Sequence, residues 1–174
     1  MNEVIKAMKE RRSIRRFLPE MPPEDILSQI AEAGIYAASG RNFQGVKVII
    51  LTDKKKRDEI SELNRSIGGW GEGFDPFYGA PAMIIVLADK THPTYLYDGS
   101  LVMGNLMLAA HTLGLGSCWI HRAKEEFEGE YGKALLSSLG IEGEWEGIGH
   151  CAIGYPADDL PAAPERKSNR IYRV

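Results

Sequence analysis

Residues 97–120 read YDGSLVMGNLMLAAHTLGLGSCWI, and this stretch sets how the rest of the chain must pack. Apolar residues fall on every side of the helix predicted over 97–113 and leave almost no polar face. A helix that is apolar all round is buried on all sides. In a small domain a second subunit is the simplest cover for one of those sides. Gly114 and Gly116 end the helix, and a short strand is expected over 117–120.

The remaining elements mix helices and strands without regular alternation. Pro22 and Pro23 begin one helix, where proline is tolerated, and β-branched residues mark 46–51 as a buried strand. Glycine and proline interrupt 68–81, which predicts a loop. The lack of repeated βαβ units favours an α+β fold. The other expected helices are 1–10, 24–38, 54–65 and 130–139, and the other expected strands are 83–87 and 146–155.

The composition predicts one globular domain over residues 1–174. Hydrophobic residues make up 44% and charged residues 26% of the 174, as in ordinary soluble proteins. A net charge of -3 provides no overall attraction for nucleic acid. The two cysteines, Cys118 and Cys151, fit a reducing compartment, and we expect neither a membrane span nor a signal peptide. These features together predict a cytoplasmic protein.

Common catalytic and metal motifs are absent. The chain has no P-loop, no G-x-G-x-x-G, no H-E-x-x-H, no C-x-x-C and no G-x-S-x-G. Its four histidines are scattered singly, so no metal site and no catalytic side chain are expected. If the protein is an enzyme, a cofactor carries the chemistry.

The segment RRSIRRF at 11–17 is the strongest polar motif. Arginine suits bidentate recognition of phosphate. In an extended segment alternate residues face the same side, so Arg11, Ser13 and Arg15 would face one ligand while Arg12 and Arg16 face away. The motif predicts a phosphate-sized site, and a plain basic surface is the alternative. The C-terminal tail from 156 is also basic and has no core of its own.

A second motif, AASGRNFQ at 37–44, follows the helix predicted over 24–38. Its small residues would let the backbone approach a flat ligand, and Ser39, Asn42 and Gln44 offer hydrogen-bonding groups. The alternative is an ordinary helix end and turn.

These motifs, with the GLGSCW strand entry at 114–119 and the basic tail, resemble the FMN-dependent nitroreductase family in the right order over nearly the whole chain. The resemblance implies an intertwined homodimer in which helices flank a central, mostly antiparallel sheet and FMN lies at the subunit interface. It also implies that 156–174 is an arm packing on the partner. The implied activity is ping-pong transfer of hydride from NADH or NADPH, through FMN, to a small nitroaromatic or quinone acceptor.

By this resemblance the cofactor-binding residues form four groups. The N-terminal group holds the phosphate, the ribityl chain and the pyrimidine edge, and the second group comes from the other subunit. The third group lies along the isoalloxazine near N5, and the fourth closes the phosphate site. In that order they are Arg11, Arg12, Ser13 and Arg15; Ala38, Ser39, Gly40, Asn42 and Gln44; Trp119, Ile120, His121 and Arg122; and Arg166 and Lys167.

One departure from the family pattern concerns His121 and Arg122, since many relatives have a small glycine near N5. The cationic pair either favours an anionic acceptor or keeps the backbone donor and points away. The loop at 68–81, with Trp70, Phe74, Phe77 and Tyr78, is expected either to cover an aromatic acceptor or to pack on the dimer surface. The alternative functions are a dehalogenase-like flavoenzyme, a non-catalytic FMN module and an RNA-binding protein.

Overall fold

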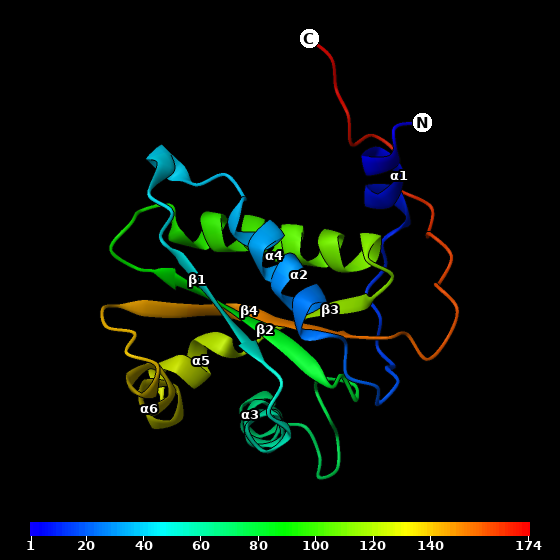
Figure 1. Cartoon of the computed structure of the whole chain (residues 1–174). Helices are drawn as coiled ribbons and strands as arrows, with labels where there is room; N and C mark the ends of the chain where they lie inside the picture. Colours follow the sequence, from blue (N-terminus) through cyan, green and yellow to red (C-terminus); the bar gives the residue numbers. More distant parts are fainter.

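A computed structural model describes residues 1–174 and shows an α+β fold built on one antiparallel sheet (Figure 1). The strand order is β1 (Val46–Leu51), β2 (Ala82–Asp89), β4 (Trp145–Gly154) and β3 (Gly116–Ile120). Strands β2 and β4 occupy the centre and are buried almost throughout. The expected fold class, with a central antiparallel sheet flanked by helices, is confirmed.

Helices cover both faces of the sheet (Figure 1). Helices α2 (Glu24–Ile35) and α4 (Tyr95–Thr112) lie on one face. Helices α3 (Lys54–Gly68), α5 (Ala123–Glu128) and α6 (Glu130–Ser138) lie on the other. Alternate residues of β2 point to opposite faces, so Ile84 joins the α2–α4 core and Ile85 joins the α3–α5–α6 core. No helix has the length and hydropathy needed to cross a bilayer.

Helix α4 packs closely on α2. A Cβ atom on Gly34 would lie 2.4 Å from Leu106 Cδ2, so the absence of a side chain at Gly34 allows this close crossing. The single chain does not bury α4 on all sides as its sequence predicts. Leu101 remains 52% exposed and Tyr97 72% exposed. An apolar strip of α4 therefore stays open in one chain.

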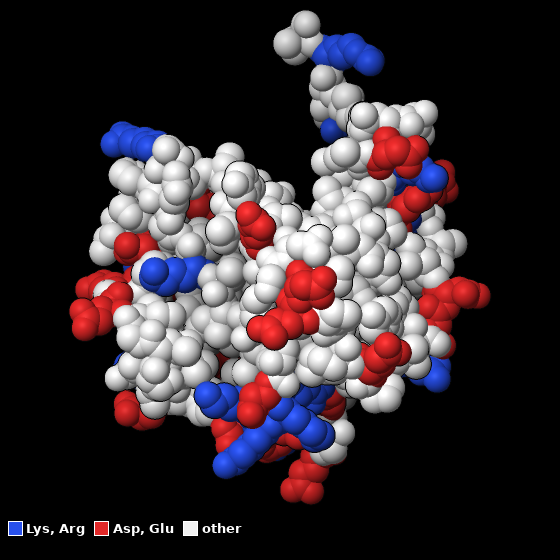
Figure 2. All heavy atoms as spheres, viewed as in Figure 1, with Lys and Arg blue, Asp and Glu red and all other residues white.

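Helix α1 and the C-terminal tail both lie at one end of the molecule, away from the sheet (Figure 1). Helix α1 (Glu3–Glu10) has no buried residue. The chain after β4 first runs beside the N-terminal segment, since Phe17 bridges Pro156 and the amide of Ala157 donates to Arg16 O. Every residue from 158 onward is exposed. Figure 2 shows this basic arm standing clear of the body.

The boundaries of helices α2, α3 and α4 differ from the sequence prediction by two or three residues, and the short helix α5 was not predicted. Helix α2 ends at Ile35 rather than at 38, because the chain turns there toward residues held by α4. Helix α3 continues to Gly68 and ends where Gly69 adopts φ 71°. Helix α4 begins at Tyr95. The short helix α5 has too few residues for a periodic signal, and its burial depends on contacts with β4.

The loop after α3 is anchored rather than free. Asp75 accepts hydrogen bonds from the amides of Phe77 (3.0 Å) and Gly79 (2.7 Å) and from Ser61 Oγ (2.8 Å), and pairs with Arg57. Phe77 is fully buried, so it belongs to the core and cannot cover a ligand. Trp70 and Phe74 remain partly exposed, and their rings lie 5.4 Å apart. Only this outer part of the loop is available as a lid.

Asp75 is expected to give the fold an acid-sensitive component. Burial alone would raise its pKa, but the hydrogen bonds from Arg57, Gly79 and Ser61 outweigh burial and lower the pKa below its ordinary value of 3.8. The stabilisation is therefore present above pH 3.8 and is lost as the pH falls through the folded-state pKa. Asp75→Asn should lower the free energy of unfolding by about 1–3 kcal/mol at pH 7, allowing for the partial exposure of the pair. Urea titrations should show the difference shrinking below pH 3.8, and a constant difference would contradict the assignment.

Candidate functional site

The N-terminal motif lies along the outer edge of β3. Ser13 bridges Ser117 in parallel, and the amide of Ile14 donates to Ser117 O at 2.9 Å. A Cβ on Gly116 would lie 2.8 Å from Ile14 Cγ1, so glycine at 116 lets the segment approach. This contact joins the two motifs 11–17 and 114–119, which are far apart in sequence.

The arginines of this motif separate only in part, because Arg15 and Arg16 line the same pocket although alternation predicts opposite sides for them. Arg16 turns to Asp158 and pairs with it at 3.0 Å. Arg11 and Arg15 form no ion pair, and Arg11 Nη1 is buried without a hydrogen-bond partner. Arg12 Nη1 donates to Lys9 O (2.8 Å) and Arg11 O (2.6 Å), while its Nε is buried and unpartnered. Buried cationic donors without acceptors are costly, so this segment fits an anionic ligand.

A pocket of about 280 Å³ opens beside the same segment. Its polar lining contains both cations and carboxylates: Ser13, Arg15, Arg16, Asp158 and Asp159. Burial raises the pKa of the Cys118 thiol, which Arg15 and Ser13 partly oppose. Helix α4 ends near the motif, where burial lowers the pKa of His111, Glu10 opposes that shift, and Arg11 and Arg12 add to it. Charges of both signs therefore surround Arg11.

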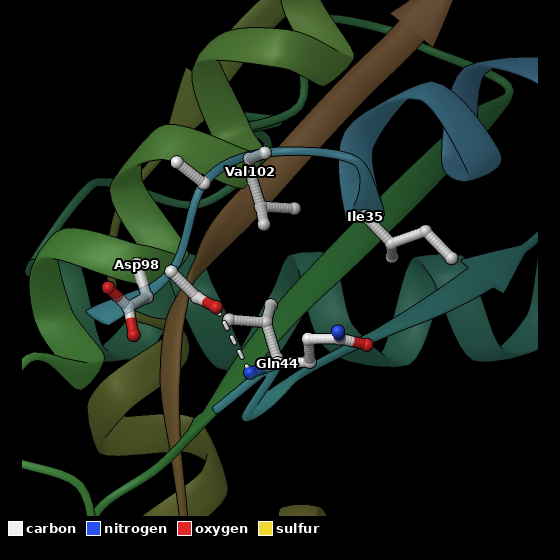
Figure 3. Close-up of a pocket in the computed structure, with 8 residues that line it drawn as sticks. Ile35, Gln44, Asp98 and Val102 are labelled. Carbon is white, nitrogen blue, oxygen red and sulfur yellow. Dashed lines mark hydrogen bonds between the residues drawn. The ribbon is translucent and has the colours of Figure 1, made fainter. Parts of the chain in front are cut away.

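The second motif forms a shaped loop rather than an ordinary helix end (Figure 3). Its residues Arg41, Asn42 and Gln44 have φ values of 50°, 59° and 52°, a conformation that non-glycine residues rarely adopt. Ser39 Oγ accepts the amide of Gln44 at 3.1 Å, and Asp98 Oδ1 accepts the amide of Gly40 at 3.0 Å. Backbone strain of this kind persists where surrounding contacts over-determine it, often at functional sites.

The pocket beside this loop is small. It measures about 130 Å³ and is lined by residues of the loop together with Ile35, Val46, Asp98 and Val102 (Figure 3). Pockets for drug-sized ligands are typically about 300–1,000 Å³. The pocket beside this loop is therefore too small to hold a drug-sized ligand by itself, and it could serve such a ligand only as part of a larger site.

The third group follows β3. Trp119 Nε1 is buried without a partner, and the Trp119 ring stacks on His121 with centroids 5.7 Å apart. Arg122 has φ 83°, and its Nη1 pairs with Glu125 at 3.0 Å. The Arg122 side chain is thus turned toward Glu125 on α5.

The left-handed conformation of Arg122 yields a stability prediction. Glycine adopts this region freely, whereas a β-branched residue is a strong outlier there. We expect Arg122→Gly to stay within about 1 kcal/mol of the parent and Arg122→Val to be destabilised by about 1–3 kcal/mol. Thermal unfolding of the three proteins measures the order, and a valine variant as stable as the glycine variant would contradict it.

Two buried polar residues outside the motifs reach these groups. Asp98, on the otherwise apolar α4, holds Gly40 and also accepts from Thr94 Oγ1 at 3.0 Å. Asn64 of α3 donates through Nδ2 to His121 O at 2.7 Å. A lone charge on an apolar helix was a usable signal for Asp98. Asn64 has no comparable signal beyond its inward helical position.

One chain brings together only two of the four predicted groups. The 11–15 segment and 119–122 share β3, whereas 38–44 is held at Asp98 near the beginning of α4. Arg11 and Arg12 lower the pKa of His111, which lies near the other end of α4. The helical rise places Asp98 and His111 about 20 Å apart. Arg166 and Lys167 lie on the exposed arm.

Comparisons of the sequence with a family model and with individual relatives point to the same family. The model of the "Nitroreductase family" matches residues 8–67 and 70–155. A relative from Archaeoglobus fulgidus that bears a nitroreductase name is 31% identical, covering 99% of this chain and 98% of the relative. The FMN reductase [NAD(P)H] of Bacillus subtilis is 28% identical over 94% of this chain and 70% of its own.

A solved structure resembles the whole chain. The FMN-bound nitroreductase of Bacteroides fragilis superposes with a TM-score of 0.91, with 29% identity and complete coverage (100%) of both chains. The family model alone spans well over half of the residues. On sequence and on fold, the chain belongs to the nitroreductase family.

Proposed function

We propose that this protein is an FMN-dependent NAD(P)H oxidoreductase that reduces a small acceptor such as a nitroaromatic or a quinone. The observation that carries the proposal is the set of unpaired arginine donors along β3, with Arg11 Nη1 and Arg12 Nε buried and lacking acceptors. A flavin phosphate supplies the acceptors that these groups lack. Membership of a family with FMN-bound relatives supports the same ligand.

The residues present fit FMN. Arg11 and Ser13 would hold the phosphate and ribityl end, and Arg15 would lie toward the polar edge of the ring. Trp119, Ile120, His121 and Arg122 would follow the ring. Bound there, FMN would supply the redox chemistry, taking two electrons as hydride from NADH or NADPH and giving them to the acceptor. The cation of Arg15, which is exposed in a single chain, would stabilise negative charge there.

The proposed site is completed by a second copy of the chain. One chain leaves apolar residues exposed on α1 (Val4, Ile5 and Met8) and on α4. Exposed apolar patches mark interaction surfaces. In a homodimer the partner would contribute Ala38, Ser39, Gly40, Asn42 and Gln44, and residues 156–174 would pack on the partner and bring Arg166 and Lys167 to the phosphate.

The dimer proposal predicts a coupled loss of association and flavin. Leu101→Glu places a charge on the exposed strip of α4 without changing the core of one chain. We expect a monomer by sedimentation at micromolar concentration and at least a tenfold weaker affinity for FMN. Ser138→Ala, on the exposed side of α6, is the matched control. A Leu101→Glu dimer with unchanged FMN affinity would contradict the proposal.

Two measurements test the proposed function: the visible absorbance spectrum of the purified protein and its rate of NAD(P)H oxidation. The purified protein, alone or after addition of FMN, should show a flavin spectrum and release FMN at about one per subunit. Steady NAD(P)H oxidation with an added quinone or nitroaromatic separates the enzyme from a non-catalytic flavin module. A colourless protein that takes up no FMN would remove the proposed function.

A further inference from the structure

Three buried polar side chains meet on the α3 face of the sheet: Asn64 of α3, Glu126 of α5 and His150 of β4. Their exposed fractions are 0%, 1% and 0%. Glu126 Oε2 lies 2.5 Å from His150 Nε2, and Asn64 Nδ2 donates to Glu126 Oε1 at 2.6 Å. Asn64 Oδ1 and His150 Nδ1 have no partner. Apolar residues often stabilise such a position as well or better, so packing alone does not account for this cluster.

The cluster is tied to the backbone at His121. The Asn64 amide group has two hydrogens, and its Nδ2 donates both to Glu126 and to His121 O. The peptide between His121 and Arg122 is therefore held from one side by a core side chain. On the other side Arg122 begins α5, since its carbonyl accepts the amide of Glu126 at 3.0 Å.

The peptide between His121 and Arg122 leads directly into the left-handed backbone of Arg122, which has φ 83°. A non-glycine residue in that conformation relaxes toward commoner ones unless its neighbours hold it. The Arg122–Glu125 pair is partly exposed and contributes little holding force. The hydrogen bond from Asn64 to His121 O is the stronger restraint, because its donor is fully buried.

We infer that Asn64, fixed in turn by Glu126 and His150, is a positioning residue that holds the 121–122 peptide in its reactive place. The inference rests on the proposed function, in which residues 119–122 follow the flavin ring. A misplacement of about 1 Å in a reacting geometry costs roughly 100-fold in rate. Asn64 should therefore control the rate of hydride transfer while leaving the affinity for FMN nearly unchanged.

The test compares Asn64→Leu with Ile60→Val. Leucine at 64 has nearly the same size but no donor. Ile60 is a buried residue one turn earlier on α3 that bonds neither 121 nor 126. Two measurements are made on each folded variant. The first is the NMR order parameter of the Arg122 amide in the FMN-free protein. The second is the single-turnover rate of flavin reduction at saturating NADH, together with the dissociation constant of FMN.

In Asn64→Leu we expect the order parameter to fall from a rigid value near 0.85 toward about 0.6. We also expect reduction to slow at least tenfold and FMN affinity to change less than threefold. Ile60→Val should leave all three nearly unchanged. An Asn64→Leu protein with a rigid Arg122 amide and an unchanged reduction rate would overturn the inference.

If leucine at 64 prevents folding, Asn64→Ser is measured instead and judged by the same criteria, because its hydroxyl ends one bond nearer the backbone and so cannot replace the bond to His121 O. The proposed function fails separately, through a parent protein that binds no FMN. The order parameter in the FMN-free protein still decides whether Asn64 holds the turn. The two failures are thus distinguishable.

Discussion

Arg11→Ala should weaken FMN binding by about 1.5–3 kcal/mol, the contribution of a hydrogen bond to a charged group, which is roughly 10- to 150-fold in the dissociation constant. The same substitution should leave the FMN-free protein as stable as the parent, or more stable. Its guanidinium is half-buried, forms no ion pair and has an unpartnered Nη1. Removing an uncompensated cation relieves a desolvation cost. Opposite signs for binding and stability distinguish a ligand-binding arginine from a structural one.

Arg16→Ala is the matched control, because Arg16 lies in the same segment but pairs with Asp158 on the exposed side. Fluorescence titration of FMN and urea unfolding of the FMN-free protein measure the two effects. We expect Arg16→Ala to change both by less than about 0.5 kcal/mol. An Arg11→Ala protein that binds FMN as tightly as the parent would exclude Arg11 from the site.

Glu126→Ala should lower the free energy of unfolding by about 3–5 kcal/mol, the largest stability effect expected from a single substitution here. The carboxylate is 1% exposed and bonds both His150 and Asn64. Its loss leaves both partners buried with unsatisfied groups, and it opens a cavity between α5 and β4. Urea unfolding at neutral pH measures the effect.

Glu125→Ala is the control, since Glu125 is the neighbouring residue and its pair with Arg122 is exposed on both sides. It should cost less than about 1 kcal/mol. The double variant Glu126→Leu with His150→Leu should recover part of the loss of Glu126→Leu alone, because replacing a buried pair with apolar residues is often neutral. Additive losses in that cycle would show that the two side chains do not act as a pair.

Local patterning was sufficient for most of the fold. Apolar runs located β2 and β4, and continuous apolarity located the helix α4, which one chain buries only in part. Composition alone did not reveal α5, because its six residues depend on tertiary contacts for their burial. The end of α2 was placed too late, since Asp98, distant in sequence, holds the chain that follows at Gly40.

The sequence identified the segments that carry the candidate site residues, but it did not show how these segments are arranged in space. Alternation along the extended segment separated the arginines only in part. Arg16 pairs with Asp158, but it lines the same pocket as Arg15, and Arg12 has a buried Nε although it was expected to face away. The sequence left the role of 37–44 open, and the positive φ values of three of its residues depend on contacts with other elements. It also grouped Phe77 with the exposed aromatics of the loop, whereas Asp75 draws Phe77 into the core.

By itself the sequence determined the α+β class, the apolar helix and a basic segment suited to an anion, since each follows from residue types at short spacing. Only the tertiary structure decided which cations lack partners, how Arg122 is held and which polar groups meet in the core. Asn64 and Glu126 are 62 residues apart, and Glu126 and His150 are 24 apart. No local pattern encodes such a meeting, because it arises only when α3 and α5 pack on the same face of the sheet.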